Sequence, residues 1–325
     1  MSNQESSSGA QKCVVITPVF NDWGSLKRLL AQLDEALSAS DLQADVLIVD
    51  DASTEPPPGN LWDDALKSIE RADVLTLACN LGHQRAIAVG LVHAAGRASE
   101  DVLVVMDGDG EDLPADVPKL VRRLHEDTAA DVVFAERHRR SESFLFRCGY
   151  AAYRLMHWLL TGVRVRFGNF SAIRASALRQ LVYHSALWNH YAAAVVRSQL
   201  AYATIPTARG RRFEGESKLN LSQLMVHGFS ALSVFSGVVC SRLFTLSLAL
   251  VALGGVGALA AVYTGSLSWP VALLGGALAA LIFIAFILGV IALIALRSAP
   301  SFIPVRDAGA FIRSVEPVSG ETARP

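Results

Sequence analysis

Short apolar runs alternate with amphipathic segments along the first two thirds of the chain. The runs have the length and β-branched content of buried strands, and they lie at 13–17, 45–49, 74–77, 102–106, 132–135 and 202–206. Helical periodicity separates them, first in the segment from Ser25, where Leu26, Leu29, Leu30, Leu33 and Leu37 share one face. Further helices are expected at 61–71, 84–95, 118–127 and 144–160. This alternation predicts an α/β fold with a doubly wound, mostly parallel sheet and flanking helices.

Two long uncharged segments follow. Leu243–Tyr263 holds 21 residues and Val271–Leu296 holds 26, and each is long enough to cross a hydrocarbon layer of ~30 Å as a helix. Arg242 precedes the first segment and Arg297 follows the second, which by the positive-inside rule places both ends in the cytoplasm. A helical hairpin buried in a soluble protein is the alternative, and two charge-free segments of this length argue against it. We expect a two-span protein of the inner (cytoplasmic) membrane.

These patterns divide the chain into five parts. Residues 1–11 are polar, lack the apolar core of a signal peptide, and are expected to be a disordered tail. Residues 12–218 form a cytosolic α/β domain, and 219–242 form juxtamembrane amphipathic helices. Residues 243–297 are the two transmembrane helices. Residues 298–325 are expected to be a second cytosolic tail.

Charge is unevenly distributed, although the net charge of the 325-residue chain is −1. Residues 1–135 contain 23 Asp and Glu against 10 Lys and Arg, whereas residues 143–213 contain 10 Arg and no acidic residue. An acidic part beside a basic part indicates a metal site that faces an anionic partner. No nucleic-acid-binding motif is present, so nucleic acid is not expected as that partner. The four cysteines are far apart in the sequence, as is typical of reduced cytosolic thiols.

Carboxylates cluster after the strand at 102–106, where four fall within six residues: Asp107, Asp109, Glu111 and Asp112. Because alternate residues of an extended chain point to one side, three of these acids converge and would repel one another without a cation. Hard oxygen ligands suit Mg²⁺ or Mn²⁺, and the intervening Gly108 and Gly110 allow close approach. The alternative is a solvated acidic turn.

A second strand, at 45–49, also ends in acids, Asp50 and Asp51. Ligands of open α/β sheets bind at the carboxyl ends of the strands, where these two acidic groups can form one pocket. The sequence contains neither a P-loop nor a Gly-x-Gly-x-x-Gly motif after the first strand. A bound diphosphate would therefore need a metal ion together with basic side chains, for which the candidates are Arg137, Arg212 and Lys218.

Taken in order, these motifs resemble family 2 glycosyltransferases with the GT-A fold. The residues that carry the resemblance are Thr17 to Asp22, Asp50 to Ser53, Asn80 with Gly82, and Met106 to Asp109. Asp107 to Pro114, Arg137, Gly215 to Lys218 and the C-terminal pair of spans narrow it to polyprenyl-phosphate glycosyltransferases. That group includes the dolichyl-phosphate mannose and glucose synthases. The similarity covers about residues 12–297.

The resemblance implies roles for individual residues. The nucleotide sugar is expected to bind to Pro18, Val19, Phe20, Asn21, Asp22, Asp50, Asp51, Asn80, Gly82, Asp107 and Gly108. A Mg²⁺ or Mn²⁺ ion is expected on Asp107, Asp109 and Glu111, with Glu111 standing where relatives often have Gln. The diphosphate and the acceptor phosphate are expected to lie against Arg137, Arg212, Ser217 and Lys218. The catalytic residues implied are Asp107, Asp109 and Arg137.

The implied reaction is an inverting, metal-dependent transfer of a hexose from a nucleotide-diphospho-sugar to a membrane polyprenyl phosphate. The lipid bilayer is then a partner, and assembly of copies through the membrane helices remains open. Because a lipid phosphate is already an anion, little general-base help is needed, and we interpret His83, His138 and His157 as structural or contact residues. Two other functions remain open: transfer to another lipid such as a diacylglycerol or hopanoid, and a non-catalytic nucleotide-binding membrane scaffold.

Two departures from the family pattern concern the acceptor. Relatives often have Gly-Asp-Phe-Arg where this chain has Gly168 to Ser171, so Arg166 or Arg174 would have to supply the missing charge. The segment from Pro300 also lacks the Tyr- and Arg-rich ending of that group. The acceptor end is therefore expected to differ, while the donor site is expected to be conventional.

Overall fold

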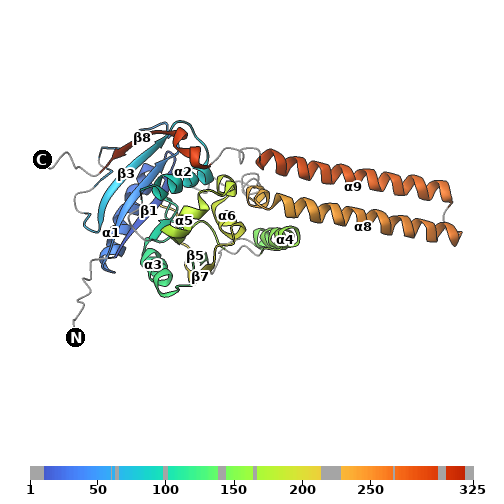
Figure 1. The fold of residues 1–325 in the computed structure, drawn as a ribbon, viewed down its shortest axis with the longest axis horizontal. Coiled ribbons are helices and arrows are strands. Elements are labelled where there is room, and N and C mark those ends of the chain that lie inside the picture. The colour runs from blue at the N-terminus through green and yellow to red at the C-terminus, as the bar shows by residue number, and fades with distance from the viewer. Residues whose placement is uncertain are drawn as a thin grey trace. The chain divides into compact units, whose positions relative to one another are not determined.

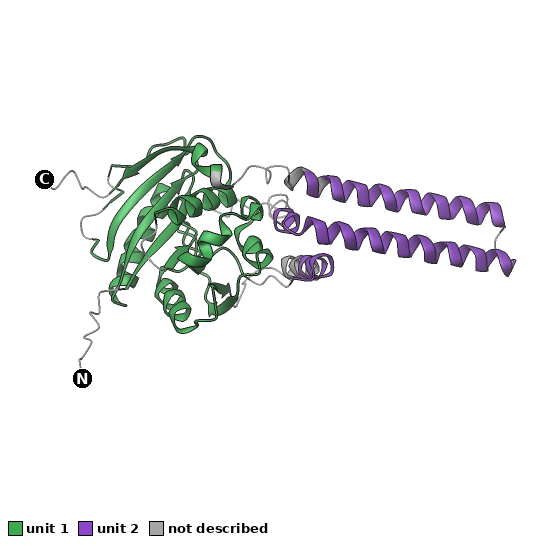
Figure 2. Ribbon diagram, in the orientation of Figure 1, with its two compact units in different colours: residues 1–141, 166–220, 301–325 green, residues 142–165, 221–300 purple. Residues whose placement is uncertain are grey.

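The computed structural model describes residues 11–59, 61–62, 66–97, 102–137, 144–163, 167–213, 228–265, 268–298 and 305–318. The chain divides into two compact units (Figure 2). Unit 1 comprises residues 1–141, 166–220 and 301–325, and unit 2 comprises residues 142–165 and 221–300. Unit 1 contains the sheet, and unit 2 is helical.

Among the described residues, unit 1 has one sheet of 8 strands in the order β7-β5-β6-β4-β1-β2-β3-β8 (Figure 1). The strands are β1 (Gln11–Val19), β2 (Leu42–Asp50), β3 (Ile69–Leu77), β4 (Val102–Val105), β5 (Val132–Arg137), β6 (Ser171–Arg174), β7 (Tyr202–Thr207) and β8 (Ile312–Pro317). β1 pairs in parallel with β2 and β4, β2 with β3, and β5 with β7. β6 is antiparallel to β4 and β5, and β8 is antiparallel to β3. The predicted mostly parallel α/β sheet is confirmed.

Helices cover both faces of this sheet. They are α1 (Trp23–Ser38), α2 (His83–Ala95), α3 (Val117–Glu126), α5 (Ala175–Leu181) and α6 (Tyr191–Arg197). Val15 and Val104 belong to one core with Leu26 of α1, whereas their neighbours along the strands point to the other face. There α2 lies close to the sheet at Gly90, where a Cβ atom would come within 2.7 Å of Val49 Cγ2.

Strand direction brings the predicted site residues to one edge of the sheet. β5 runs in the same direction as β4, because both are antiparallel to β6. The carboxyl ends of β1, β2, β4 and β5 therefore lie at the same edge, together with the start of β6. Val19 pairs with Asp50, so the end of β1 lies between the ends of β2 and β4. The strand order reverses there, which is where ligands bind in open α/β sheets.

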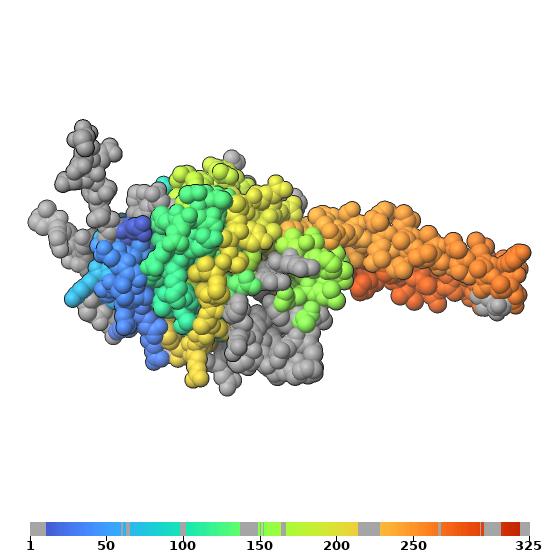
Figure 3. Space-filling model, turned by 90° about the horizontal axis from the view of Figure 1, so that it is seen from below, coloured from blue at the N-terminus to red at the C-terminus, as the bar shows by residue number. Residues whose placement is uncertain are grey.

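Unit 2 contains α4 (Phe144–Thr161), α8 (Ser236–Tyr263) and α9 (Trp269–Ser298). α8 and the segment Trp269–Ala292 of α9 are long and apolar enough to cross a membrane, and only 6% and 11% of their most apolar stretches are buried. A core helix of a soluble protein would be mostly buried. Figure 3 shows α8 and α9 side by side along their length.

α4 also exposes apolar side chains, although its sequence includes Arg147 and Arg154. Leu155 and Leu159 are 56% and 57% exposed, and Trp158 is 39% exposed. Within unit 2, Arg242 holds the end of α4 by donating to the carbonyl oxygens of Trp158 at 3.5 Å and Leu159 at 2.7 Å. The basic residue that precedes the first charge-free segment thus caps a helix C-terminus.

Three expectations differ from the structure. The helix predicted at 61–71 is wrong wherever this segment is described: residues 61–62 and 66–68 are not helical, and β3 begins at Ile69. One carboxylate oxygen of Asp34 accepts the backbone N–H groups of residues 67–69 and so fixes this start, a tertiary contact that local periodicity cannot reveal. The apolar helix starts at Ser236 rather than Leu243.

The third difference lies at the C-terminal end. Residues 298–325 were expected to be a tail, but they contain η4 (Val305–Phe311) and the edge strand β8. β8 pairs with β3, so the chain returns to the sheet of unit 1 after α9. Both ends of the α8–α9 hairpin therefore lead back to the same unit. The predicted disordered tail at 1–11 lies, except for its last residue, outside the described residues.

Candidate active site

The loops after β1 and β2 are joined by hydrogen bonds. Asn21 has a left-handed backbone with φ of 50°, and its N–H donates to Ser53 Oγ at 2.9 Å. Its Oδ1 accepts from the backbone N and the hydroxyl of Thr54, at 2.9 and 3.1 Å. Asp50 Oδ1 accepts the N–H of Ser53 at 2.9 Å. Phe20, 42% exposed, projects beside this loop pair.

Asp51 fixes a third loop, the one between β3 and α2. Its carboxylate is 4% exposed and accepts the N–H groups of Leu81 at 2.7 Å and Gly82 at 2.9 Å. Asn80 Nδ2 donates to the carbonyl oxygen of Asp51 at 3.2 Å. Burial raises the pKa of Asp51 above its ordinary value of 3.8, although the two N–H groups lower it. Gly82 has a φ of +87°, which favours glycine. Asp51 therefore shapes the loop that leads into α2.

The loop after β4 presents three partly exposed carboxylates. The side chains of Asp107, Asp109 and Glu111 are 29%, 23% and 20% exposed. Asp112 differs, because it is 2% exposed and its Oδ2 accepts the N–H of Asp107 at 3.0 Å. Asp109 Oδ1 accepts the N–H of Glu111 at 3.0 Å. Asp112 thus shapes the loop, whereas the side chains of the other three acids are partly exposed at the carboxyl edge of the sheet.

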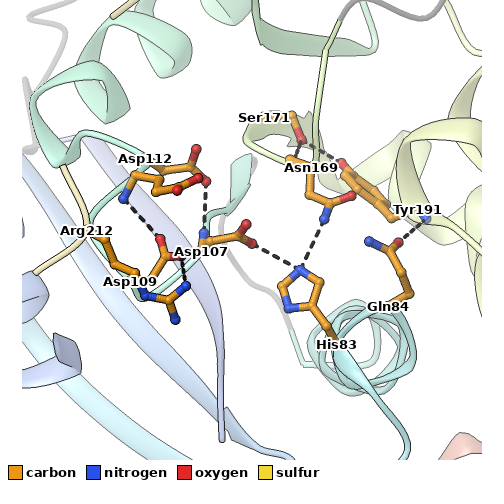
Figure 4. Close-up of polar contacts among 10 residues, drawn as sticks. His83, Gln84, Asp107, Asp109, Asp112, Asn169, Ser171, Tyr191 and Arg212 are labelled. Atoms are coloured by element: carbon orange, nitrogen blue, oxygen red, sulfur yellow. Dashed lines mark hydrogen bonds and ion pairs between the residues drawn. The ribbon is translucent and has the colours of Figure 1, made fainter. Parts of the chain in front are cut away.

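His83 at the start of α2 contacts this loop (Figure 4). Its Nε2 lies 3.2 Å from Asp107 Oδ1 and 3.2 Å from Asn169 Nδ2. Burial lowers the pKa of His83, but the carboxylates of Asp107, Asp109 and Asp112 raise it more, so the pKa lies above 6.5. Asn169 is 8% exposed. His83 therefore packs against the Asp107 carboxylate, which favours the protonated form of the imidazole.

Residues 208–213, which follow β7 and are called the strap here, bring two arginines to the acidic loop. Arg209 contacts Glu111 at 2.7 Å. Arg212 lies farther from its partners, 3.6 Å from Asp109 and 3.7 Å from Asp22. Burial and then the carboxylates of Asp107 and Glu111 hold the pKa of Asp109 above 3.8, although the Glu111 N–H and Arg212 lower it. The strap thus supplies counter-charge to the loop.

The structure describes only some of the remaining predicted residues. Arg137 is the last residue of β5 and so lies at the same edge, but nothing is described of its side chain. Ser217, Lys218 and Arg166 lie outside the described residues. Arg174 does not supply charge to the site, because its guanidinium donates to the carbonyl oxygens of Leu124, Asp127 and Ala130 at the end of α3.

The comparison with known protein families decides the assignment. Residues 14–182 match the family described as Glycosyl transferase family 2. The chain belongs to glycosyl transferase family 2. It is therefore a glycosyltransferase.

Two curated relatives agree with this membership. The undecaprenyl-phosphate 4-deoxy-4-formamido-L-arabinose transferase of Edwardsiella ictaluri (strain 93-146) is 27% identical over 253 residues, which cover 73% of this chain and 75% of that protein. An uncharacterized glycosyltransferase of Bacillus subtilis (strain 168) is 27% identical over 244 residues, which cover 71% and 69%.

The fold also matches a solved glycosyltransferase. Glucosyl-3-phosphoglycerate synthase from Mycobacterium tuberculosis, solved with Mn²⁺, UDP-glucose and phosphoglyceric acid, aligns with a TM-score of 0.50 and 15% identity. The alignment covers 71% of this chain and 79% of that chain. This likeness shows the GT-A fold of the glycosyltransferase, as the sequence resemblance implies.

The acidic loop offers the donor set that a hard divalent cation requires. Carboxylate oxygens are its usual protein ligands, and Asp109 already lies 3.6 Å from one cationic group, the guanidinium of Arg212. Among the described residues, however, no three His, Cys, Asp or Glu side chains are already gathered as a metal site. A cation on this loop would compete with the arginines that contact Asp109 and Glu111.

Sequence reasoning missed two contacts of this glycosyltransferase. Arg209 and Phe213 flank the predicted Arg212, but nothing in their sequence indicates that the strap lies on the loop after β4. His83 was interpreted as a structural or contact residue, and the structure shows the contact to be with Asp107. The acidic residues were predicted to lie at the carboxyl ends of the strands, and the structure places them there.

Proposed function

We propose that this glycosyltransferase moves a hexose, with inversion, from a nucleotide-diphospho-sugar to a membrane polyprenyl phosphate in a metal-dependent reaction. One observation carries the proposal: the same chain holds exposed carboxylates at the switch point of a GT-A sheet and a pair of unburied apolar helices. The first feature suits an activated sugar, and the second suits an acceptor dissolved in a bilayer. The relatives named as undecaprenyl-phosphate transferases support the same acceptor class.

The α8–α9 hairpin supports a lipid acceptor that reaches the site from the membrane, on the side where unit 1 lies. Because β8 follows α9 and pairs with β3, the chain enters and leaves the hairpin from unit 1. Arg242 and Arg297 flank the two spans, so the positive-inside rule favours a cytosolic catalytic unit and cytosolic termini in the inner membrane. The exposed apolar surface of α8 and α9 also leaves room for assembly of copies within the bilayer.

On the donor side, the loops at the edge would hold the nucleotide. We assign the base and ribose to Pro18 through Asp22, to Asp50 and Asp51, and to Asn80 with Gly82. Gly108 is assigned to the donor as well; a Cβ atom there would come within 3.2 Å of Thr17 Oγ1, so this glycine keeps the loop after β4 close to the end of β1. Arg137, Arg212, Ser217 and Lys218 are proposed to contact the diphosphate and the acceptor phosphate.

Mg²⁺ or Mn²⁺ would be held by Asp107, Asp109 and Glu111. When bound, the ion neutralises charge that develops on the leaving diphosphate, an effect that supplies several kcal/mol in enzymes of this kind. Asp112 stays turned into the loop and keeps Asp107 in place through the Asp107 N–H. His83 holds the other side of the Asp107 carboxylate.

A single displacement accounts for inversion. An oxygen of the lipid phosphate attacks the anomeric carbon, the bond from that carbon to the diphosphate breaks, and the nucleoside diphosphate leaves with the electron pair. No proton has to be removed, because the lipid phosphate is ionised at neutral pH. The His83–Asp107 pair is therefore not required as a general base, and an α-linked donor would give a β-linked product.

The donor sugar can be a hexose or a pentose derivative, and a donor panel distinguishes the two. The relatives are named for a formamido-arabinose, which is a pentose derivative rather than a hexose. A donor panel should therefore contain UDP- and GDP-hexoses as well as UDP-linked amino-pentoses. The hexose assignment fails if only a pentose donor yields product.

The test is incubation of membranes that contain the chain with labelled nucleotide sugars and polyprenyl phosphate. Wild type should form a labelled lipid, and Asp109→Ala should abolish it. Glu35→Gln, an exposed change on α1 away from the site, is the matched control and should retain transfer. Undiminished transfer by Asp109→Ala would reject the metal assignment.

A further inference from the structure

The strap is fastened to the loop after β4 by its backbone as well as its side chains. The N–H of Gly210 donates to the carbonyl oxygen of Glu111 at 2.9 Å, and the N–H of Phe213 donates to that of Asp109 at 2.9 Å. The ring of Phe213 lies over Gly110, where a Cβ atom would come within 2.7 Å of the ring. Gly110 has a φ of +90°. The loop is therefore shaped to receive the strap.

Glu111 is the centre of this contact. Its backbone carbonyl accepts from Gly210, and its carboxylate contacts Arg209 at 2.7 Å. Arg212 is held less closely, at 3.6 Å from Asp109. The Arg209–Glu111 pair is thus the short ion pair between strap and loop in the described residues. It uses the carboxylate that the proposed function assigns to a divalent cation.

We propose that Arg209 and Glu111 form a latch that holds the strap closed, and that a divalent cation opens it by competing with Arg209 for Glu111. The inference rests on the proposed function, because it takes the cation to bind at the acidic loop. Arg209 is then a positioning residue: it keeps the strap on the loop before the cation arrives and releases it afterwards.

The partial exposure of Arg209 and Glu111 limits how strongly their ion pair can weaken cation binding. The side chains of Arg209 and Glu111 are 31% and 20% exposed, so the ion pair is partly solvated and only moderately strong. A cation that binds only the unlatched form has its apparent affinity reduced by the unlatched fraction. Removal of Arg209 should therefore tighten cation binding by about two- to fivefold, and no more.

The first experiment measures Mn²⁺ binding to the full chain in detergent, without nucleotide, by the electron paramagnetic resonance signal of free Mn²⁺. Arg209→Gln should bind about two- to fivefold more tightly than wild type. Arg211→Gln removes the same charge from an exposed neighbour in the strap and is the control for long-range electrostatics. Equal effects of the two substitutions would overturn the latch.

The second experiment follows hydrogen exchange of the strap amides, which reports opening without any turnover. Mn²⁺ should speed exchange at Gly210 and Phe213 in wild type, and Arg209→Gln should exchange faster without Mn²⁺. Glu111→Gln should have the same effect, and the double variant should show no further increase, because both changes break one contact. Additive increases, or exchange slowed by Mn²⁺ in wild type, would contradict the proposal.

The two proposals fail in distinguishable ways. If wild type binds no Mn²⁺, the assigned cation site is wrong and the latch falls with it. If wild type binds Mn²⁺ through the acidic loop but Arg209→Gln behaves as Arg211→Gln does, the latch alone is rejected.

Discussion

The carboxylates after β2 and those after β4 lie at the same edge of the sheet, yet they bind different partners. Asp51 is 4% exposed and its carboxylate is held by two backbone N–H groups of the next loop. Asp109 and Glu111 are 23% and 20% exposed and face arginines of the strap. The first group is bound by the backbone of the fold, and the second by side chains that can move away.

This difference in partners indicates a structural role for Asp51 and a ligand-binding role for Asp109 and Glu111. A buried carboxylate bound by backbone N–H groups cannot leave without orphaning those donors, so Asp51 serves chiefly to shape the loop that leads to Gly82. A carboxylate paired with an arginine can exchange that partner for another cation at small cost. The acids after β4 are therefore the ones suited to bind and release a cation.

The strongest test of this contrast is Asp109→Asn. The change keeps the shape of the side chain but removes the charge, so lipid-linked transfer should fall at least about 100-fold, as expected when one electrostatic contact to developing charge is lost. The melting temperature should stay near that of wild type, because the partner is a partly exposed arginine. Transfer rates and melting curves on the same preparation check both statements; a stability loss that accounts for the lost rate would contradict them.

Asp51→Ala should lower the stability of the fold, which Asp109→Asn is expected to leave nearly unchanged. It leaves the N–H groups of Leu81 and Gly82 without their acceptor, which should lower the free energy of unfolding by about 2 kcal/mol. Chemical denaturation of the full chain in detergent measures this loss, with the exposed Glu35→Ala as control, expected within about 0.5 kcal/mol of wild type. If the two variants unfold alike, Asp51 has no structural role.

Gly110→Ala tests the shape of the loop after β4. A side chain at a φ of +90° is strained, and its Cβ would meet the Phe213 ring, so we expect a loss of about 1–2 kcal/mol together with a displaced strap. Gly96→Ala is the matched control, because Gly96 has a φ of −81° and room for a Cβ. Thermal unfolding of both variants compares them, and equal stability would show that the strap does not rest on Gly110.

The smallest expected effect is a pH dependence at Asp51. Because burial raises its pKa above 3.8 in the folded chain, the folded state binds more protons than the unfolded state between the two pKa values. The stability that Asp51 contributes relative to Asp51→Asn is therefore greatest below the unfolded value, and it falls as pH rises through the folded pKa. Melting temperatures of both chains from about pH 3.5 to about 6.5 measure this, and a difference that grows with pH would contradict it.

Much of the sheet followed from the sequence, because its strands are short apolar runs, two of which are followed by pairs or clusters of acids. β8 could not be predicted: Ile312–Pro317 follows a long apolar helix, and only its pairing with β3 makes it a strand. The helix expected at 61–71 failed because Asp34, far away in sequence, fixes the start of β3.

The candidate site was predicted in outline for the same reason. Strand ends mark the edge of the sheet, so the location of Asp107 and Asp109 at that edge followed from the sequence, while their roles in binding and catalysis stay predictions. Arg209 and Phe213 were not, because a loop after β7 has no periodicity that points to β4. Nor does sequence distinguish the buried Asp112 from its exposed neighbours, since that depends on one hydrogen bond to the Asp107 N–H.

The most direct measurement places the purified full chain in lipid nanodiscs with a nucleotide-sugar panel, and offers either polyprenyl phosphate or the matching polyprenol. Mass spectrometry of the lipid fraction then shows which acceptor carries a sugar. The account predicts a polyprenyl-phosphate sugar only with the phosphorylated lipid, and none with Asp109→Asn. Product on the uncharged polyprenol, or equal product from Asp109→Asn, would contradict it.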